Sequence, residues 1–445
     1  MKNLIYATGS RVLQIICSAL IIILSAIFLT KSHQGLLLTL NSIAAVQIFF
    51  ELGFSSVILQ YVGHERRYLA FDRVSGFSGP SEKLERLANI YRLASTWFNW
   101  GAIGCSIFLL IGGSLFFYDH GNSQDMPWML PLIFLSICVP LSLYSQRFWV
   151  VYEGFGHINE VYKLRLCASV SSCVAIIILF LYGYGLFAPI ISPFFNFVFS
   201  QVLRIREYSF WVRISDIKFA ADAKKIIFKE ILALQSKISV SWLCGFFMIQ
   251  SITPIVYKFS GPESAAVVGI GMSAVLITNG LLSVLLQVKI PELLELIKCG
   301  ELLKYFSFGK KLAIQTFAAS LVVSLIGGIF IALLNIFNVN WLSSRLPDLH
   351  AYTFFMLAAI VNQIIATQAT LTRLFKVEPY LYHSILVAVS TVLVIAFAAK
   401  DSSTTGIAIC YFLITLLVSL PSSTYIYLSE KKKRIPSAHN LHSNL

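Results

Sequence analysis

The sequence predicts an all-α integral membrane protein with twelve transmembrane helices, arranged as two six-helix bundles in a 6+6 pseudo-repeat. Of the 445 residues, 57% are hydrophobic and only 12% are charged, about half the charged share of a soluble globular protein. A membrane helix uses about 20 apolar residues, so twelve spans need about 240, which this hydrophobic share just supplies. The mean hydropathy of +0.77 agrees. A soluble enzyme is therefore excluded.

Twelve apolar runs of sufficient length follow one another along the chain. They lie at 12–30, 36–62, 93–118, 127–146, 166–185, 187–203, 238–257, 264–288, 312–336, 351–371, 381–399 and 406–428. Several contain proline, for example Pro140 and Pro193, which membrane helices tolerate as kinks. No series of short alternating segments occurs, so the sequence does not indicate a β-barrel.

The distribution of Lys and Arg predicts that both termini are cytoplasmic. With the N-terminus inside, the outer loops hold only Lys31, Lys258, Arg345 and Lys400, and the other 30 of the 34 basic residues lie on the inner side. This is the asymmetry that the positive-inside rule describes. The net charge of +13 is thus explained by topology and anionic inner-leaflet lipid, and nucleic acid is not an expected partner.

The longest basic connection divides the spans six and six. We expect an N-terminal bundle over 1–203, a cytoplasmic linker with an amphipathic helix over 204–237, a C-terminal bundle over 238–428 and a basic cytoplasmic tail over 429–445. Ser56–Gln60 (SVILQ) aligns with Ser283–Gln287 (SVLLQ), and Glu65 aligns with Glu292 at the same offset. Both halves begin inside, so the repeat is parallel, as in many transporters.

Two inner segments have the pattern of interfacial amphipathic helices. Leu84, Leu87, Ala88 and Tyr91 form an apolar stripe at helical spacing, and residues 217–236 alternate lysines with large apolar residues. A surface helix against lipid headgroups explains both segments, and a hinge between the two bundles is the functional alternative for 217–236.

The eight cysteines fall in predicted spans or in an inner loop, and none forms a CxxC pair. The sequence therefore predicts neither a structural disulfide nor a zinc site. No cleavable signal peptide is expected, because the first apolar run is long and lacks a cleavage region.

One acidic residue, Glu51, lies deep in a predicted span, and Gln47 shares its helix face. A charge at the middle of a bilayer costs roughly 2.5–3.5 kcal/mol on insertion scales, so it requires a partner, water or neutralisation. Two interpretations remain open. Glu51 is either a hydrogen-bonded strut between helices or a cavity residue that couples transport to protons.

Four cations lie at the inner ends of spans, at positions that the repeat makes equivalent in pairs. Arg11 and Lys237 begin the first and seventh spans, and Arg147 and Arg373 end the fourth and tenth. In one interpretation, these long basic side chains only extend toward the membrane–water interface and have no further role. The functional interpretation is a ring of cations around an inward-open cavity, suited to a diphosphate.

Catalytic motifs are absent from the sequence. It contains no GxxxxGK[ST] loop, no HExxH and no paired carboxylates in a loop, and the outer loops are short. We therefore expect a protein that is not an enzyme, with no cofactor or metal site, although H⁺ or Na⁺ remains a possible coupling ion.

Two segments and the span pattern resemble the multidrug/oligosaccharidyl-lipid/polysaccharide exporter (MOP) superfamily. Gln47–Glu65 (QIFFELGFSSVILQYVGHE) is similar to the second-span region of bacterial polysaccharide flippases, and Tyr152–Glu160 (YEGFGHINE) to the inner loop after their fourth span. The resemblance implies a Wzx-like O-antigen flippase of the bacterial inner membrane, acting in lipopolysaccharide or related polysaccharide biosynthesis. It also implies undecaprenyl-diphosphate-linked oligosaccharide as cargo, alternating access, ion coupling, and contacts with membrane lipids and other polysaccharide assembly proteins.

Three other classes of membrane protein share part of this pattern. A multidrug and toxin extrusion (MATE) type cation antiporter shares the architecture, but acidic residues are expected in its cavity, and here the inner mouth is basic. A membrane glycosyltransferase, polymerase or acyltransferase requires a catalytic His or carboxylate and long loops. An uncoupled lipid scramblase stays open.

Overall fold

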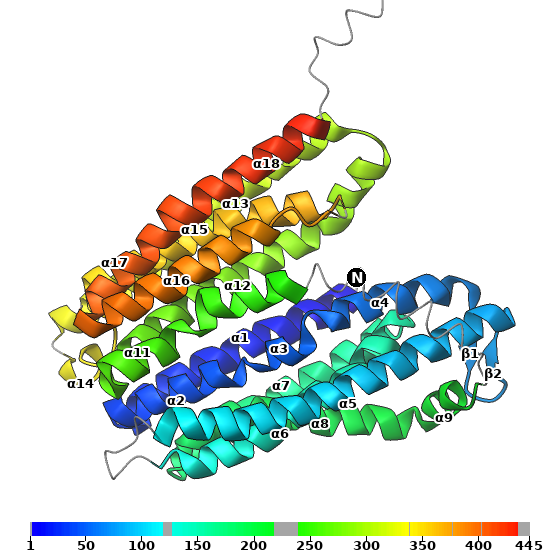
Figure 1. Cartoon of the computed structure of the whole chain (residues 1–445), viewed down its shortest axis with the longest axis horizontal. Helices are drawn as coiled ribbons and strands as arrows, with labels where there is room; N and C mark the ends of the chain where they lie inside the picture. Colours follow the sequence, from blue (N-terminus) through cyan, green and yellow to red (C-terminus); the bar gives the residue numbers. More distant parts are fainter. Residues whose placement is uncertain are drawn as a thin grey trace, which may run out of the picture. The chain divides into compact units, whose positions relative to one another are not determined.

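The computed structural model describes residues 2–118, 127–217, 239–337, 339–375, 377–401 and 403–434. Within these ranges, residues 2–8, 11, 291, 340, 341 and 401 are described by their backbone alone. The chain divides into two compact units, 1–246 and 247–445 (Figure 1).

The described residues confirm an all-α membrane fold and contain ten or eleven of the twelve predicted spans. Ten helices are long and apolar enough to cross a membrane. A further span is a pair of helical segments, Ser239–Gln250 and Ile252–Ser260, that meet at a bend of 42°, and Val12–Phe28 is a shorter apolar stretch within the first helix. Each of these overlaps one of the twelve predicted runs.

The N-terminal unit consists of six spans and a small cap of irregular structure at one end (Figure 1). Its elements are α1 (Lys2–Phe28), α2 (Lys31–Ala44), α3 (Gln47–Glu51), α4 (Phe54–Glu65), η1 (Arg66–Tyr68), β1 (Ala70–Asp72), β2 (Gly76–Ser78), α5 (Ser81–Tyr118), α6 (Met129–Gly154), α7 (Ile158–Leu181), η2 (Gly185–Phe187), α8 (Ala188–Arg206) and α9 (Tyr208–Asp216). α6 packs against α4, α5, α7 and α8, and α7 packs against α1 and α8.

The C-terminal unit is built in the same way around α15 (Leu349–Arg373). Its other elements are the π-helical turn η3 (Phe246–Gln250), α11 (Ile252–Ser260), α12 (Pro262–Lys298), α13 (Leu302–Ile336), α14 (Asn340–Ser343), α16 (Leu381–Asp401), α17 (Thr404–Ile414), the π-helical turn η4 (Thr415–Ser419) and α18 (Leu420–Arg434). α15 packs against α12, α13, α17 and α18.

Burial repeats from one half to the other, which supports the 6+6 pseudo-repeat. In the most apolar 18-residue stretch of each of the second to sixth spans, 56, 28, 56, 33 and 28% of the residues are buried. In the eighth to twelfth spans the corresponding shares are 61, 17, 56, 39 and 33%. The second and fourth helices of each half are thus the most buried, and the others present more apolar side chains to the surroundings, as helices in lipid do.

The second span is broken, whereas the sequence predicted one helix over 36–62. α2 ends at Ala44, α3 ends at Glu51, and Leu52 and Gly53 have left-handed backbones with φ of 51° and 72°. A Cβ at position 53 would lie 2.6 Å from the indole nitrogen of Trp242, so only glycine fits there. The break places the carboxyl of Glu51 at a helix end rather than in mid-helix.

The prediction of a separate interfacial helix around Leu84–Tyr91 is wrong. These residues form the first turns of α5, which runs unbroken for 38 residues. Leu87 and Ala88 are fully buried, and the ring of Tyr91 lies 5.7 Å from that of Trp211 on α9. The apolar stripe therefore packs against protein instead of lipid headgroups.

A β-hairpin that the sequence analysis did not identify precedes α5. β1 and β2 pair antiparallel, with Phe71 opposite Phe77, and both rings pack on Phe210 of α9. The Asp72 carboxylate accepts hydrogen bonds from the backbone N–H groups of Ser75 (2.8 Å) and Val74 (2.9 Å), which hold the pKa of Asp72 below its ordinary value. The hairpin and α9 thus form a small aromatic cap.

The expected linker over 204–237 is described only in part. Residues 204–206 complete α8, and α9 follows almost at once. The remainder, with the predicted amphipathic helix over 217–236, lies outside the described residues beyond Ile217.

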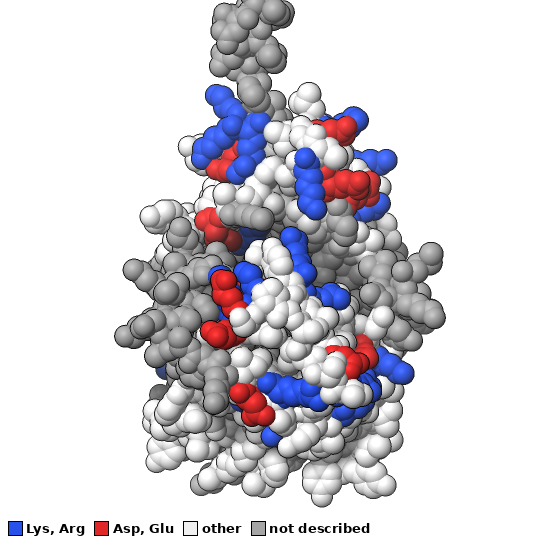
Figure 2. Space-filling view, turned by 90° about the vertical axis from the view of Figure 1, so that its right-hand side faces the viewer, with Lys and Arg blue, Asp and Glu red and all other residues white. Residues whose placement is uncertain are grey.

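Figure 2 looks onto one end of the helices, where Lys, Arg, Asp and Glu side chains gather. In the N-terminal unit this end, called the charged end below, carries the hairpin, α9, the start of α5 and α7 and the end of α4 and α8. Its carboxylates are extensively paired. Glu65, only 1% exposed, lies 3.0 Å from Arg86 and 3.6 Å from Lys83.

The prediction that no structural disulfide forms is wrong, because Cys17 on α1 and Cys173 on α7 are joined. The two residues are 156 positions apart, and their Cα atoms lie 5.3 Å apart where the helices pack side by side. Sequence spacing could not reveal this pair, since it depends on which helices are neighbours. The other six cysteines are free thiols.

Thiol labelling tests the disulfide directly. The denatured protein should react with an alkylating agent at six cysteines without reductant and at eight after reduction, as counted by intact mass. Cys17→Ser should leave seven reactive thiols under both conditions. Eight reactive thiols in the untreated wild-type chain would contradict the bridge.

Candidate functional site

The N-terminal unit contains a polar cavity of about 430 Å³. Five helices supply its lining: α1, α3, α6, α7 and α8. The lining residues are mostly small or polar: Gln14, Cys17, Ser18, Gln47, Ser142, Gln146, Arg165, Ala168, Ser169, Ser172, Ser192, Pro193 and Asn196. A water-accessible polar space among membrane helices is where transport proteins hold their cargo.

Helical spacing explains how these side chains meet. On α7, Arg165, Ser169 and Ser172 follow one another at four and three residues, so they line one face of the helix. On α1, Gln14 and Ser18 are four apart in the same way. Asn196 from α8 donates a hydrogen bond to Ser142 of α6 at 3.2 Å, which joins two of the walls.

Arg165 is the charged residue among the described lining residues of the cavity. Its guanidinium lies 3.5 Å from the Glu153 carboxylate and packs over the rings of Trp149 and Tyr162 at 5.5 and 5.4 Å. Tyr162 donates a hydrogen bond to the same carboxylate at 3.0 Å. These contacts fix the position of Arg165 while leaving its side chain 24% exposed.

Gln47 and Glu51, both predicted as site residues, lie on the short helix α3. Gln47 lines the cavity. Glu51 follows one turn later at the break in the span, where its carboxylate accepts a 2.5 Å hydrogen bond from Ser55. Arg165 acts on Glu51 electrostatically, so the carboxyl and the cavity cation influence each other.

The four predicted cations are not all placed at this cavity. The side chain of Arg11 and all of Lys237 lie outside the described residues, although Gln14 and Ser18 of the same helix as Arg11 do line the cavity. Arg147 does not line it, and instead donates a 3.0 Å hydrogen bond to Asn99 of α5.

Arg373, in the other unit, is neutralised by a carboxylate. Its Nε and Nη2 atoms each lie 2.8 Å from an oxygen of Glu378, a bidentate pair, and its guanidinium lies 5.5 Å from the ring of Tyr380. A bound anion would therefore compete with Glu378 for this side chain.

The sequence analysis missed Arg165, which it counted only among the inner-side charges. A signal was present, because Arg165, Ser169 and Ser172 make a polar stripe at helical spacing at the start of an apolar span. The direction in which that stripe points depends on how α7 packs against α1 and α8.

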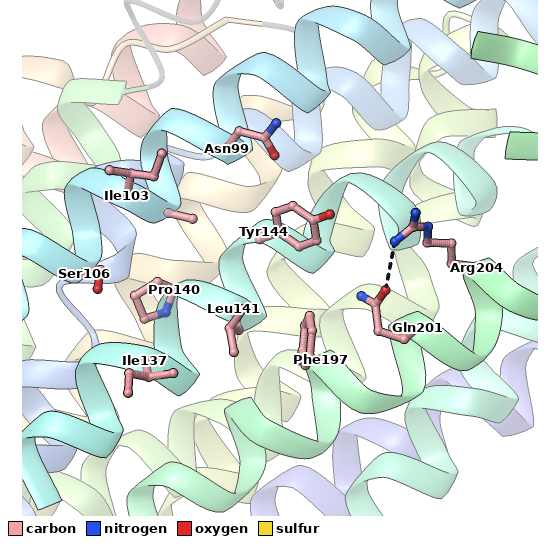
Figure 3. Close-up of a pocket in the computed structure, with 11 residues that line it drawn as sticks. Asn99, Ile103, Ser106, Ile137, Pro140, Leu141, Tyr144, Phe197, Gln201 and Arg204 are labelled. Carbon is pink, nitrogen blue, oxygen red and sulfur yellow. Dashed lines mark hydrogen bonds between the residues drawn. The ribbon is translucent and has the colours of Figure 1, made fainter. Parts of the chain in front are cut away.

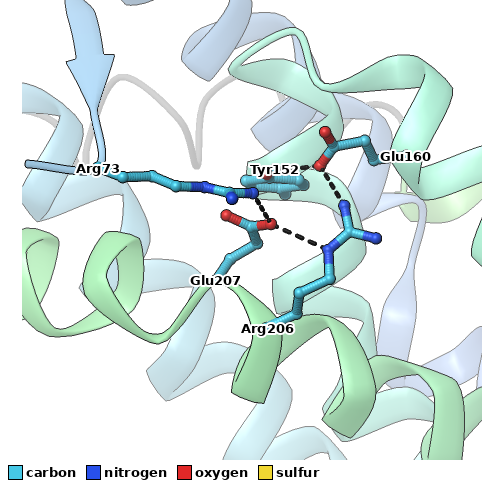
Figure 4. Close-up of polar contacts among 5 residues, drawn as sticks. All are labelled: Arg73, Tyr152, Glu160, Arg206 and Glu207. Atoms are coloured by element: carbon cyan, nitrogen blue, oxygen red, sulfur yellow. Dashed lines mark hydrogen bonds and ion pairs between the residues drawn. The ribbon is translucent and has the colours of Figure 1, made fainter.

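A second set of polar contacts ties the cavity helices together at the charged end (Figure 4). Glu207 is 1% exposed, and one of its oxygens lies 2.7 Å from Arg73 of the β1–β2 turn and 3.1 Å from Arg206. Arg206 also contacts Glu160 of α7 at 2.8 Å, and Glu160 accepts a 2.9 Å hydrogen bond from Tyr152 of α6. We call these five residues the charged-end network.

The network continues into stacked rings. His157, which immediately precedes α7, stacks on Tyr152 with ring centroids 4.2 Å apart and planes 10° apart. Burial lowers the pKa of His157, so its imidazole is neutral near pH 7. The ends of α6, α7 and α8 that frame the cavity are therefore held by both charge pairs and aromatic packing.

Comparison with solved structures identifies the fold. A multidrug resistance MATE family transporter of the MOP superfamily, in an inward-facing conformation, matches with a TM-score of 0.59 and 14% identity over 97% of this chain and 96% of its own. The lipid II flippase MurJ, in an inward closed conformation, matches with a TM-score of 0.59 and 13% identity over 97% of this chain and 90% of its own.

A MOP superfamily transporter from Pyrococcus furiosus also matches, with a TM-score of 0.59 and 12% identity over 97% of this chain and 94% of its own. That protein is described as having a binding pocket of reverse polarity that suggests a different function. Searches with protein-family models and curated protein sequences find no match. At these identities the comparisons establish that the chain has the fold of MOP superfamily transporters.

Proposed function

We propose that the chain is a flippase that moves an anionic, lipid-linked oligosaccharide from the inner to the outer leaflet of a bacterial inner membrane. The cargo class is an undecaprenyl-diphosphate-linked repeat unit, such as that of O-antigen or a similar polysaccharide. The fold it shares with a lipid II flippase supports the transport of a lipid-linked substrate.

The observation that carries the proposal is the charge of the polar cavity. Its described lining residues include one cation, Arg165, and no carboxylate. Arginine presents a planar fork of N–H donors that matches phosphate oxygens, and serines and amides such as Ser169 and Gln146 suit sugar hydroxyls. This lining favours a diphosphate sugar over a cationic drug, although a diphosphate must compete with Glu153 for the Arg165 guanidinium.

In this proposal the polar headgroup enters the cavity while the lipid tail stays in the bilayer. The diphosphate displaces Glu153 from part of the Arg165 guanidinium, and the sugar hydroxyls replace water on Gln47, Asn196 and the serines. Arg11 and Lys237 are proposed as further diphosphate ligands at the inner mouth. Transport then proceeds by alternating access, in which the cavity opens to one side of the membrane at a time.

The distribution of Lys and Arg supports an orientation of the protein in the membrane. The charged ends of the units face the cytoplasm, where anionic lipid attracts their Lys and Arg side chains. The cargo is built on that side, so the inner mouth receives it there. Other polysaccharide assembly proteins are the proposed source and recipient of the cargo.

A cation antiporter of the MATE type is the second candidate. Glu51 is the observation that favours it, because a carboxyl beside a membrane cavity can bind a proton or Na⁺, and a MATE transporter is among the similar structures. The Arg165 charge acting on Glu51 opposes the binding of an organic cation at the same place.

Reconstitution distinguishes the two candidates. Proteoliposomes are loaded with a fluorescent undecaprenyl-diphosphate oligosaccharide, and exposure of its label to a membrane-impermeant quencher is followed with and without an ion gradient. We expect protein-dependent exposure of this lipid and no gradient-driven uptake of a cationic dye such as ethidium. Dye transport without lipid translocation would replace the flippase with the antiporter.

A further inference from the structure

The N-terminal unit has a second hollow, of about 650 Å³, on the side of α5, α6 and α8 (Figure 3). We call it the lateral groove. Most of its wall is apolar, with Ala102 and Ile103 from α5, Ile137 and Leu141 from α6, and Phe197 from α8. This volume is within the range of ligand pockets, about 300–1,000 Å³.

The lateral groove is separate from the polar cavity, although α6 borders both. Ser142 and Gln146 of α6 face the cavity, whereas Leu141 and Tyr144 face the groove. Next to the groove, Ile103 and Ile137 are 51% and 49% exposed, as expected of side chains that meet lipid. The groove therefore opens toward the acyl chains of the bilayer.

One end of the groove is polar and positive. Figure 3 shows the Tyr144 hydroxyl, Gln201 and Arg204 at the end opposite to Ile137 and Pro140. Arg147 lies at the same end, 3.9 Å over the ring of Tyr144 and hydrogen-bonded to Asn99. Arg147 and Arg204 both pack over Phe148, at 4.6 and 5.8 Å from its ring centre.

These two cations repel each other, and their contacts among the described residues are all with neutral groups. Arg204 donates to the Gln201 amide at 3.4 Å, and its charge acts on Arg147. The Nε of Arg147 is buried with no hydrogen-bond partner in the described part of the chain. Two guanidinium groups at the edge of a membrane span, with amides and rings as partners, are complementary to an anion.

We propose that the lateral groove binds one anionic phospholipid of the surrounding leaflet. Its phosphate lies between Arg147 and Arg204, with Asn99, Gln201 and Tyr144 completing the hydrogen bonds. One acyl chain lies along the apolar wall between α5 and α8. The proposal does not depend on the transported cargo, because these residues are apart from the polar cavity.

The charge and the shape of the groove together select this occupant. A free phosphate would satisfy the two cations but leave the apolar wall empty. A protein helix or a second copy of the chain would fill the wall but needs a carboxylate placed at Arg204. A phospholipid supplies both parts in one molecule, and its headgroup is at the depth of the helix ends.

Native mass spectrometry of the full-length protein in detergent tests the proposal by titration with phosphatidylglycerol, phosphatidylcholine or inorganic phosphate. We expect one phosphatidylglycerol to bind at a concentration at which phosphatidylcholine does not. Arg204→Gln should weaken that binding about tenfold, because it removes a charged hydrogen-bond donor. Ala102→Phe should weaken it as well by filling the apolar wall.

The matched control is Arg67→Gln, which removes the same charge from an exposed side chain away from the groove and should bind phosphatidylglycerol as the wild type does. Melting temperatures of all variants establish that they are folded. Equal binding of the two lipids, or unchanged binding in folded Arg204→Gln, would overturn the proposal. If millimolar inorganic phosphate competes with the lipid and Ala102→Phe has no effect, the groove is only an anion site. That result would also overturn the proposal.

Discussion

Arg165→Gln is expected to lower translocation of the lipid-linked cargo by about tenfold to a hundredfold. The substitution removes the charge from the polar cavity, and a hydrogen bond to a charged group contributes about 1.5–3 kcal/mol. Arg165→Lys should retain part of the activity, because it keeps the charge but loses the planar fork of donors. The measurement is the rate of label exposure in proteoliposomes, together with surface polysaccharide in cells.

The matched control for this experiment is Lys163→Gln. Lys163 is an exposed cation two residues away on the same helix, and it is not among the residues that line the cavity. Because Arg165 also contacts Glu153 and packs over Trp149, the amount of membrane-inserted protein and its melting temperature must be compared. Wild-type translocation by a folded Arg165→Gln protein would remove the cavity cation from the mechanism.

If Glu51 couples transport to protons, Glu51→Gln is expected to leave the protein folded but to make transport independent of the proton gradient. The amide keeps the size of the side chain and can still accept the hydrogen bond from Ser55, but it cannot release or take up a proton. Transport rates measured across external pH should therefore become flat and low, and Glu51→Asp should be intermediate.

Ser55→Ala is the control that separates the two interpretations of Glu51. It removes the hydrogen bond and keeps the carboxyl, so a strut would be weakened while a proton-binding group would still titrate. If Glu51→Gln transports as the wild type does at every pH, and Ser55→Ala lowers the melting temperature, Glu51 is a strut.

The architecture could be predicted from the sequence because membrane spans are long and apolar. All twelve runs correspond to apolar helical segments of the described residues, and the division into halves agrees with the repeated pattern of burial. Local backbone detail within a span could not be predicted. The break after Glu51 depends on the close approach of Trp242 to Gly53, a contact between residues 189 positions apart.

Some residues of the candidate cavity could be picked out from the sequence, and others could not. Gln47 could be chosen because a polar residue in an apolar run needs an explanation, and it does line the cavity. Arg147 was chosen by its position at a span end, but the face of α6 on which it lies directs it to Asn99 and the lateral groove. The rotation of a helix about its own axis decides which cavity a side chain faces. The number and position of charges along the sequence contain no information on that rotation.

The charged-end network has a consequence for the order in which the protein is made. Its members, from Arg73 to Glu207, are all synthesised before the second half of the chain leaves the ribosome. The 238 residues that follow take on the order of 10–50 s to translate, far longer than a side-chain contact takes to form. The ends of the first six spans that carry the network can therefore be fastened together before the C-terminal half is complete.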